Sequence, residues 1–347
     1  MSGSLWRPMA TLAGAFCWAV LMSAAPVAQR GAPQPECRAV DGTTRYVCGQ
    51  RSPEDLAHLT GSDWVVASWL SGGLALIRTS DHRVTMLYPS PNLTQRFDRA
   101  TYPDCPGPPP ADAGAGYAGL GVSARGAGGY TLYASRFGRD RAVDVFDVDT
   151  SGATPAAAWV GCVRPPDAVS VNDVAPLPGG GFVSTNWSAT VPGEVWEWLP
   201  ARGWAVLPGT EGIDGPNGIQ VSPDGRTVYF AGWGARRMYK ITRGTAPPRL
   251  DSVPVDFHPD NINFASDGTL LAAGQSCRLA DCQGRPDGFH VARIDPDTLV
   301  VTPLVEQVNT PAFGAATTAL QVGDGIWVGS FRSNRIAIFP VSPVRQP

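Results

Sequence analysis

The pattern from which the fold is predicted is clearest in Asp224-Gly-Arg-Thr-Val-Tyr-Phe-Ala-Gly232, which is followed by Arg237-Met-Tyr-Lys-Ile241. An Asp-Gly pair leads into a run of β-branched and aromatic residues, and a second turn leads into another such run. Asp-Gly turns between alternating apolar runs are strong signals of β-hairpins. The stretch therefore predicts two adjacent antiparallel strands.

The same order of turn, apolar run, turn and apolar run recurs along the chain. Later copies begin at Asp267-Gly268 and Asp324-Gly325, and earlier copies begin near Trp64, Tyr130 and Gly181. Six copies spaced by roughly 45 to 60 residues are typical of a propeller, in which each blade is a small antiparallel sheet. A β-sandwich would explain the strands but not a repeat of that length. The expected fold class is all-β, a six-bladed β-propeller.

Residues 1–28 have the features of a cleaved export signal. Arg7 precedes an apolar run from Met9 to Met22, and small residues follow at Ala24 and Ala28, as cleavage requires. A membrane anchor is the alternative, but Gly14 interrupts the run, which is shorter than the roughly 20 residues that a span needs. We therefore expect a secreted or periplasmic protein without a membrane span.

The rest of the chain is expected to form two parts, a disulfide-bearing segment at residues 29–51 and the propeller at residues 52–347. The 40 Gly and 33 Pro argue against long helices. Removal of the leader takes away Arg7 and no acid, so the net charge of -3 becomes -4. This mild acidity argues against a nucleic-acid partner.

Seven cysteines occur, and Cys17 leaves with the leader. The even number that remains in an exported chain predicts disulfides. Spacing alone leaves the connectivity open. The pairs favoured by nearness in sequence, and then by elimination, are Cys277–Cys282, Cys37–Cys48 and Cys105–Cys162.

Polar residues recur immediately before the β-runs of four blades. The innermost strands of a propeller converge on a central channel, so equivalent positions of different blades can meet there. Two carboxylates and three amide oxygens would suit a hard cation, most naturally Ca²⁺ in that channel. A turn role would explain any one of these residues, but not their recurrence at one position of the repeat. They are Glu54, Asn172, Asn217, Asp260 and Asn261.

From about Ser52 to Phe339 the chain resembles the regucalcin/gluconolactonase/paraoxonase superfamily of six-bladed calcium propellers. The segments that carry the resemblance, which is greatest to the paraoxonase branch, are Glu54-Asp55-Leu56, Ser170-Val-Asn-Asp-Val174, Pro216-Asn-Gly-Ile219 and Asp260-Asn261-Ile262. The resemblance implies that the five residues named above bind a catalytic calcium. It also implies a second, structural calcium bound by Asp55, Asp173 and a backbone carbonyl near Leu120.

The chain departs from the paraoxonase branch at the two histidines of that branch. Ala118 stands at the first position and Arg136 at the second, so a histidine dyad cannot be carried over. In the gluconolactonase branch the metal polarises the carbonyl, and the aspartate matched by Asp260 is the proposed base. Arg136 is then expected at the channel mouth as a fixed charge for acidic substrates. His258, two residues before Asp260, is a candidate proton carrier.

The leading hypothesis is an exported calcium-dependent hydrolase of lactones or related esters. The competing hypothesis is a calcium-stabilised propeller that binds a small ligand or a protein partner without turnover. A strictosidine-synthase-like enzyme is a third possibility, although such enzymes usually lack this metal set. The segment Gly114-Ala-Gly-Tyr-Ala-Gly119 has the spacing of a dinucleotide loop but not its strand and helix context.

Overall fold

The structure is a computed structural model that describes residues 35–109, 114–138, 140–188, 190–277 and 286–341. The export signal predicted at residues 1–28 lies outside this part of the chain. All regular secondary structure in the described residues is β-strand. They contain no helix that is long and apolar enough to cross a membrane.

The stretch around Asp224 forms the hairpins that its sequence predicts. Val221 pairs with Val228 across the first turn, where Gly225 has a φ of +73°. The carboxylate of Asp224 accepts a hydrogen bond from the backbone N–H of Arg226 at 3.0 Å. A residue with a side chain rarely adopts this φ, so the glycine fixes the position of the turn.

The strands form six sheets, or blades, in chain order. The first blade contains β3 (Pro53–His58), β4 (Trp64–Trp69), β5 (Leu74–Arg78) and β6 (Val84–Tyr88). The second contains β8 (Tyr117–Gly126), β9 (Gly129–Arg136), β10 (Ala142–Asp149) and β11 (Ala156–Val163), with β7 (Thr94–Gln95) parallel to β11. The third contains β12 (Val171–Pro176), β13 (Phe182–Asn186), β14 (Val195–Leu199) and β15 (Gly203–Val206).

The fourth blade contains β16 (Pro216–Val221), β17 (Thr227–Gly232), β18 (Arg237–Thr242) and β19 (Leu250–Pro254). The fifth contains β20 (His258–Phe264), β21 (Leu270–Ser276), β22 (Gly288–Ile294) and β23 (Val301–Val308). The last contains β24 (Ala316–Val322), β25 (Gly325–Ser330), β26 (Ile336–Pro340), β2 (Thr44–Val47) and β1 (Val40–Asp41).

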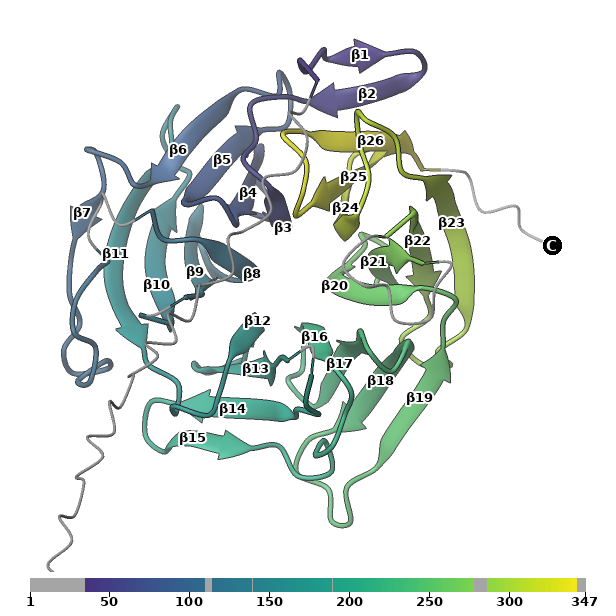
Figure 1. Ribbon diagram of the computed structural model, residues 1–347. Helices are drawn as coiled ribbons and strands as arrows, with labels where there is room; N and C mark the ends of the chain where they lie inside the picture. Colours follow the sequence, from purple (N-terminus) through teal and green to yellow (C-terminus); the bar gives the residue numbers. More distant parts are fainter. Residues whose placement is uncertain (1–34, 110–113, 139, 189, 278–285, 342–347) are drawn as a thin grey trace, which may run out of the picture. The chain divides into compact units, whose positions relative to one another are not determined.

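The first strands of the blades lie innermost and form a closed ring (Figure 1). Each contacts its counterpart in the next blade, and the order around the ring is β3, β8, β12, β16, β20 and β24, with β24 in contact with β3 again. This arrangement confirms the six-bladed β-propeller that the repeat predicts.

The last blade joins the two ends of the described chain. Strand β2, purple in Figure 1, pairs antiparallel with β26, which is yellow. Residues 44–47 therefore belong to the propeller, and the boundary expected between residues 51 and 52 is wrong. A strand of this length is too short to display an alternating pattern. Its partner also lies at the other end of the sequence, so nothing local marks the pairing.

Disulfides tie down two peripheral segments. Cys37 is bonded to Cys48 and Cys105 to Cys162, as the cysteine analysis predicts. Cys277 is also disulfide-bonded. Its expected partner, Cys282, lies outside the described residues.

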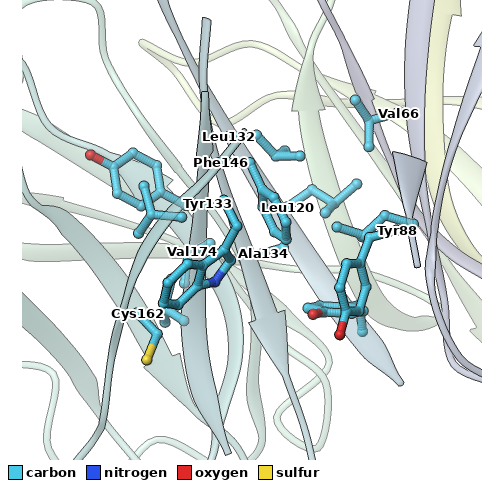
Figure 2. Packing of buried hydrophobic residues seen from close by; sticks show 14 of the residues in the cluster. Val66, Tyr88, Leu120, Leu132, Tyr133, Ala134, Phe146, Cys162 and Val174 are labelled. Carbon is cyan, nitrogen blue, oxygen red and sulfur yellow. The ribbon is translucent and has the colours of Figure 1, made fainter. Parts of the chain in front are cut away.

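Apolar side chains fill the space between neighbouring blades. Figure 2 shows Leu120, Leu132 and Phe146 gathered between strands, and all three are buried. Because blades pack on both faces, their strands do not alternate strictly: every residue of β4 is buried. This packing fixes the inner strands that carry the candidate site.

Candidate functional site

A β-bulge interrupts the innermost strand of every blade at the same place. The pairing of the first strand with the second shifts between Pro53/Leu56, Tyr117/Leu120, Val171/Val174, Pro216/Ile219, Pro259/Ile262 and Ala316/Thr318. A bulge leaves residues out of the hydrogen-bond ladder and turns their side chains in a new direction. One residue from each bulge lines a single cavity, and these residues are Glu54, Ala118, Asn172, Asn217, Asp260 and Thr317. We call them the bulge ring.

A second ring of residues surrounds the same cavity, which has a volume of about 480 Å³. In each blade the first residue of the bulge pairs with a residue of the second strand or immediately after it. The residue that follows this partner lines the cavity, and five of the six residues at this position are apolar or aromatic. They are Leu70, Phe137, Trp187, Trp233, Gln275 and Phe331. We call them the apolar ring, with Gln275 as its polar exception.

Four buried oxygens of the inner strands have no hydrogen-bond donor. They are Glu54 Oε2, Asn172 Oδ1, Asn217 Oδ1 and Asn261 Oδ1. Three belong to residues that line the cavity, and the fourth belongs to Asn261, which does not line it but donates through Nδ2 to Glu54 Oε1 at 3.1 Å. Each comes from a different inner strand, and all four residues belong to the set that the sequence assigns to calcium. A buried polar atom without a partner costs folding free energy, and an ion is one of the ordinary reasons for it. The donor set therefore fits a hard cation.

The carboxylates alone would not make a metal site. The described residues contain no group of three or more His, Cys, Asp or Glu side chains placed to hold an ion. Calcium accepts amide and carbonyl oxygens as readily as carboxylates. Any cation in this cavity therefore depends on the oxygens of Asn172, Asn217 and Asn261.

Asp260 is held in position by a chain of hydrogen bonds. Gln275 Nε2 donates to Asp260 Oδ2 at 2.7 Å and to the carbonyl of Ala316 at 2.6 Å. Trp233 Nε1 donates in turn to Gln275 Oε1 at 2.6 Å. These bonds fix one oxygen of the carboxylate, and Asn217 also donates a hydrogen bond to the Asp260 side chain.

Burial disfavours the ionised form of both cavity carboxyl groups. It raises the pKa of Asp260 to about 7, with a further increase from the charge of Asp55 and opposing hydrogen bonds from Gln275 and Asn217. Burial also raises the pKa of Glu54 well above its ordinary value, and the charge of Asp260 adds to the effect. An opposite charge beside a carboxylate favours ionisation, so a bound cation would reverse these shifts.

The second set of predicted ligands is arranged differently. Asp55 Oδ1 accepts hydrogen bonds from Leu56 N and Thr318 Oγ1, and Asp55 Oδ2 accepts one from Leu120 N, all at 2.8 Å. Asp173 accepts bonds from Val174 N at 2.7 Å and from Ile219 N at 2.8 Å. Leu120 thus presents its N–H to Asp55. Every carboxylate oxygen in this set has a protein donor, so the set does not fit an ion by the criterion that the first set meets.

These carboxylates instead link neighbouring inner strands. Asp55 joins β3 to β8 and β24, and Asp173 joins β12 to β16. Asp173 lies so close to β8 that a Cβ at Gly119 would be 2.1 Å from its Oδ1. The glycine is therefore required by this close approach.

Arg136 does not lie at the channel mouth, contrary to expectation. Its guanidinium is buried, and its Nε lies 3.0 Å from Asp144 Oδ2. Tyr117 donates to the same oxygen at 2.8 Å. Arg136 does not line the cavity, because its side chain is directed to the buried Asp144 within the blade.

His258 is also outside the described lining. Its Nδ1 lies 2.9 Å from the carbonyl oxygen of Trp233, and the two rings are 4.5 Å apart. Burial lowers the pKa of His258. His258 packs against Trp233. It does not line the cavity, whereas a proton carrier would have to do so.

Sequence analysis missed Arg141, Gln275 and the apolar ring, all of which line the cavity. Arg141 lies in the hairpin between β9 and β10. Alignment of the repeats at the end of the second strand would have revealed the ring, because its members share one position.

No family model and no curated protein matches the sequence. Solved structures do match. A gluconolactonase from Xanthomonas campestris has a TM-score of 0.56 at 17% identity, covering 87% of this chain and 91% of the other. A luciferin-regenerating enzyme gives 0.51 at 13% identity, with coverage of 87% and 93%. A streptogramin B lyase gives 0.51 at 11% identity, with coverage of 85% and 96%.

These structural matches establish the fold. Their sequence identities are too low to separate a paraoxonase-like from a gluconolactonase-like branch. The chain is a six-bladed β-propeller that is structurally similar to gluconolactonase and to the luciferin-regenerating enzyme.

Proposed function

We propose that the protein is an exported calcium-dependent hydrolase of lactones or related esters. The observation that carries the proposal is a set of four unpartnered oxygens near Asp260. Three are contributed by the lining residues Glu54, Asn172 and Asn217, and one by Asn261, which contacts Glu54. These residues together with Asp260 would hold one calcium ion. A gluconolactonase and a luciferin-regenerating enzyme share the fold, which is compatible with this chemistry but does not establish it.

Bound calcium would act as a Lewis acid that polarises the carbonyl of the substrate. The chain itself supplies the orientation of the reacting groups. Gln275 fixes the carboxylate of Asp260. The carboxylate would accept a proton from a water molecule as the water attacks the carbonyl carbon, and would return that proton to the ring oxygen as the acyl C–O bond breaks. The apolar ring excludes bulk water and surrounds the remainder of the substrate.

Ionised Asp260 is a weak base once a cation lies beside it, because the cation lowers its pKa. No histidine lines the described part of the cavity, and Glu54 and Asp260 are its carboxyl groups there. With these groups we expect the site to hydrolyse lactones and to act poorly on aryl esters and phosphotriesters.

The same composition supports an alternative, a calcium-stabilised propeller that binds a small ligand without turnover. A cavity that offers only a cation-bound carboxylate as base can recognise a carbonyl compound without hydrolysing it. The two functions bind the same ligands and differ in whether a bond is broken.

A substrate panel separates the two functions. The mature protein is assayed on lactones and aryl esters at saturating calcium, after chelation, and after calcium is added back. Hydrolysis of lactones that disappears on chelation and returns with calcium supports the enzyme. No hydrolysis of any lactone by protein shown to contain calcium would contradict it and leave the binding protein.

A further inference from the structure

Arg141 is the only positively charged residue in the described lining of the cavity. Its Nη1 donates to the carbonyl of Val169 at 3.2 Å, and it forms no ion pair with another described residue. Buried Arg136, by contrast, is paired with Asp144. The charge of Arg141 is therefore available to a ligand.

Trp187 supplies a second donor to the same wall. Its Nε1 is buried and has no hydrogen-bond partner, whereas the equivalent atom of Trp233 donates to Gln275. An indole N–H can only donate, so a ligand oxygen is the natural partner for it. No described protein atom accepts a hydrogen bond from this donor.

Arg141 and Trp187 contact the same short segment of the chain. The backbone N–H of Trp187 donates to the carbonyl of Ser170 at 2.9 Å, and Arg141 donates to the preceding residue, Val169. Ser170 itself lines the cavity. Arg141 and Trp187 thus flank one short segment between the second and third blades.

Charge balance explains what this wall should bind. The carboxylates of Glu54 and Asp260 would balance a bound calcium ion, and Arg141 would then remain as an unbalanced positive charge. A guanidinium binds a carboxylate through charge-assisted hydrogen bonds. Leu70, Phe137 and Phe331 add apolar surface to the same cavity, and Phe137 is 44% exposed.

We propose that Arg141 and Trp187 make the cavity selective for lactones that carry a carboxylate on an apolar body. This selectivity rests on the proposed function, since it concerns the substrate of the same site. Asp260 and the asparagine oxygens engage the lactone end, and Arg141 engages the carboxylate end.

The test compares a matched pair of lactones, γ-(4-carboxyphenyl)-γ-butyrolactone and its carboxamide. For the calcium-loaded protein we expect kcat/KM to favour the carboxylate by about tenfold or more, because hydrogen bonds between charged groups are the strong ones. Arg141→Gln should abolish this preference, Arg141→Lys should keep part of it, and Trp187→Phe should reduce it by a smaller factor. Arg226→Gln removes an exposed arginine, 82% accessible and paired only with Asp224, and should leave the preference unchanged.

Equal kcat/KM values for the two lactones, or a preference that survives Arg141→Gln, would overturn the inference while leaving the hydrolase intact. If neither lactone is hydrolysed, the proposed function fails, and calorimetry then decides the inference alone. In that case hydrocinnamate should bind more tightly than hydrocinnamamide, and only in proteins that retain Arg141. Equal binding of both compounds would reject it.

Discussion

Asn172 carries a buried oxygen that has no donor. In the protein without metal such an atom lowers the free energy of unfolding by about 1–3 kcal/mol. Asn172→Leu should therefore leave the stability of the metal-free protein unchanged or raise it by about 1 kcal/mol. The same change should reduce the stabilisation by calcium. Thermal unfolding with calcium and after chelation measures both effects.

Asn263 is the matched control, because it lies on the same ring of strands with its amide satisfied. It donates to Thr318 Oγ1 at 3.2 Å and to the carbonyl of Ala319 at 3.3 Å. Asn263→Leu should lower stability with and without calcium by about 1 kcal/mol. If Asn172→Leu behaved in the same way, its oxygen would not be a ligand.

The stability of the metal-free protein should depend on pH in the direction that Asp260 dictates. Its pKa rises from an ordinary value of 3.8 to about 7 on folding, so the folded state binds the proton more tightly than the unfolded state. The contribution to stability is then fully present below about pH 4 and is lost as the pH rises through about 7. Denaturant unfolding of the metal-free protein across this range should therefore give a lower free energy of unfolding at higher pH.

Calcium should remove this loss, because it binds the ionised carboxylates. The stabilisation by a fixed calcium concentration should therefore grow as the pH rises. A calcium effect that is constant between about pH 4 and about pH 7 would contradict the assignment of Asp260 as a ligand.

The bulges of the inner strands are the elements that convert a repeat of sheets into a site. One residue of each bulge lines the cavity. In β3 and β12 the next residue, Asp55 or Asp173, bonds a neighbouring inner strand. The sequence places Asn and Asp at this position of the repeat, and from this recurrence alone the candidate ligands were predicted. It did not indicate that the second residues hold backbone N–H groups, because such bonds depend on strands that are far apart in sequence.

Asp55→Ala should lower stability strongly, because it leaves the backbone N–H groups of Leu56 and Leu120 without an acceptor. We expect a loss of at least about 2 kcal/mol in unfolding by denaturant, with the calcium content unchanged. Asp224→Ala, in an exposed turn, is the control and should cost much less. If Asp55→Ala instead removed one of two bound calcium ions, the structural calcium that the family resemblance implies would be established.

At the scale of the whole molecule, the repeat predicted the all-β class and the number of blades. The five candidate ligands of the first ion converge because equivalent positions of a propeller must meet at its centre. The positions of Arg136 and His258 could not be predicted in this way. A shift of one residue along a strand turns a side chain to the opposite face, so Phe137 lines the cavity and Arg136 does not.

The pairing of β2 with β26 leads to a prediction about the N-terminal part of the propeller. A protein that begins at Ser52 lacks the strand that covers β26 and exposes its edge. We expect its melting temperature to fall by roughly 10 °C or more relative to a chain that begins at Gln34, with greater aggregation. Equal melting temperatures for the two chains would show that residues 34–51 are an appendage, as the sequence suggested.

The most direct test of the proposed calcium site is the metal content of the purified protein. Wild-type protein and Asp260→Ala are dialysed against metal-free buffer and analysed for calcium and zinc by mass spectrometry. We expect about one calcium and no zinc per wild-type chain, because one set of oxygen ligands is available. Asp260→Ala should lose that calcium. Stoichiometric zinc in the wild type, or the absence of any bound metal when calcium is supplied, would contradict the proposed calcium site.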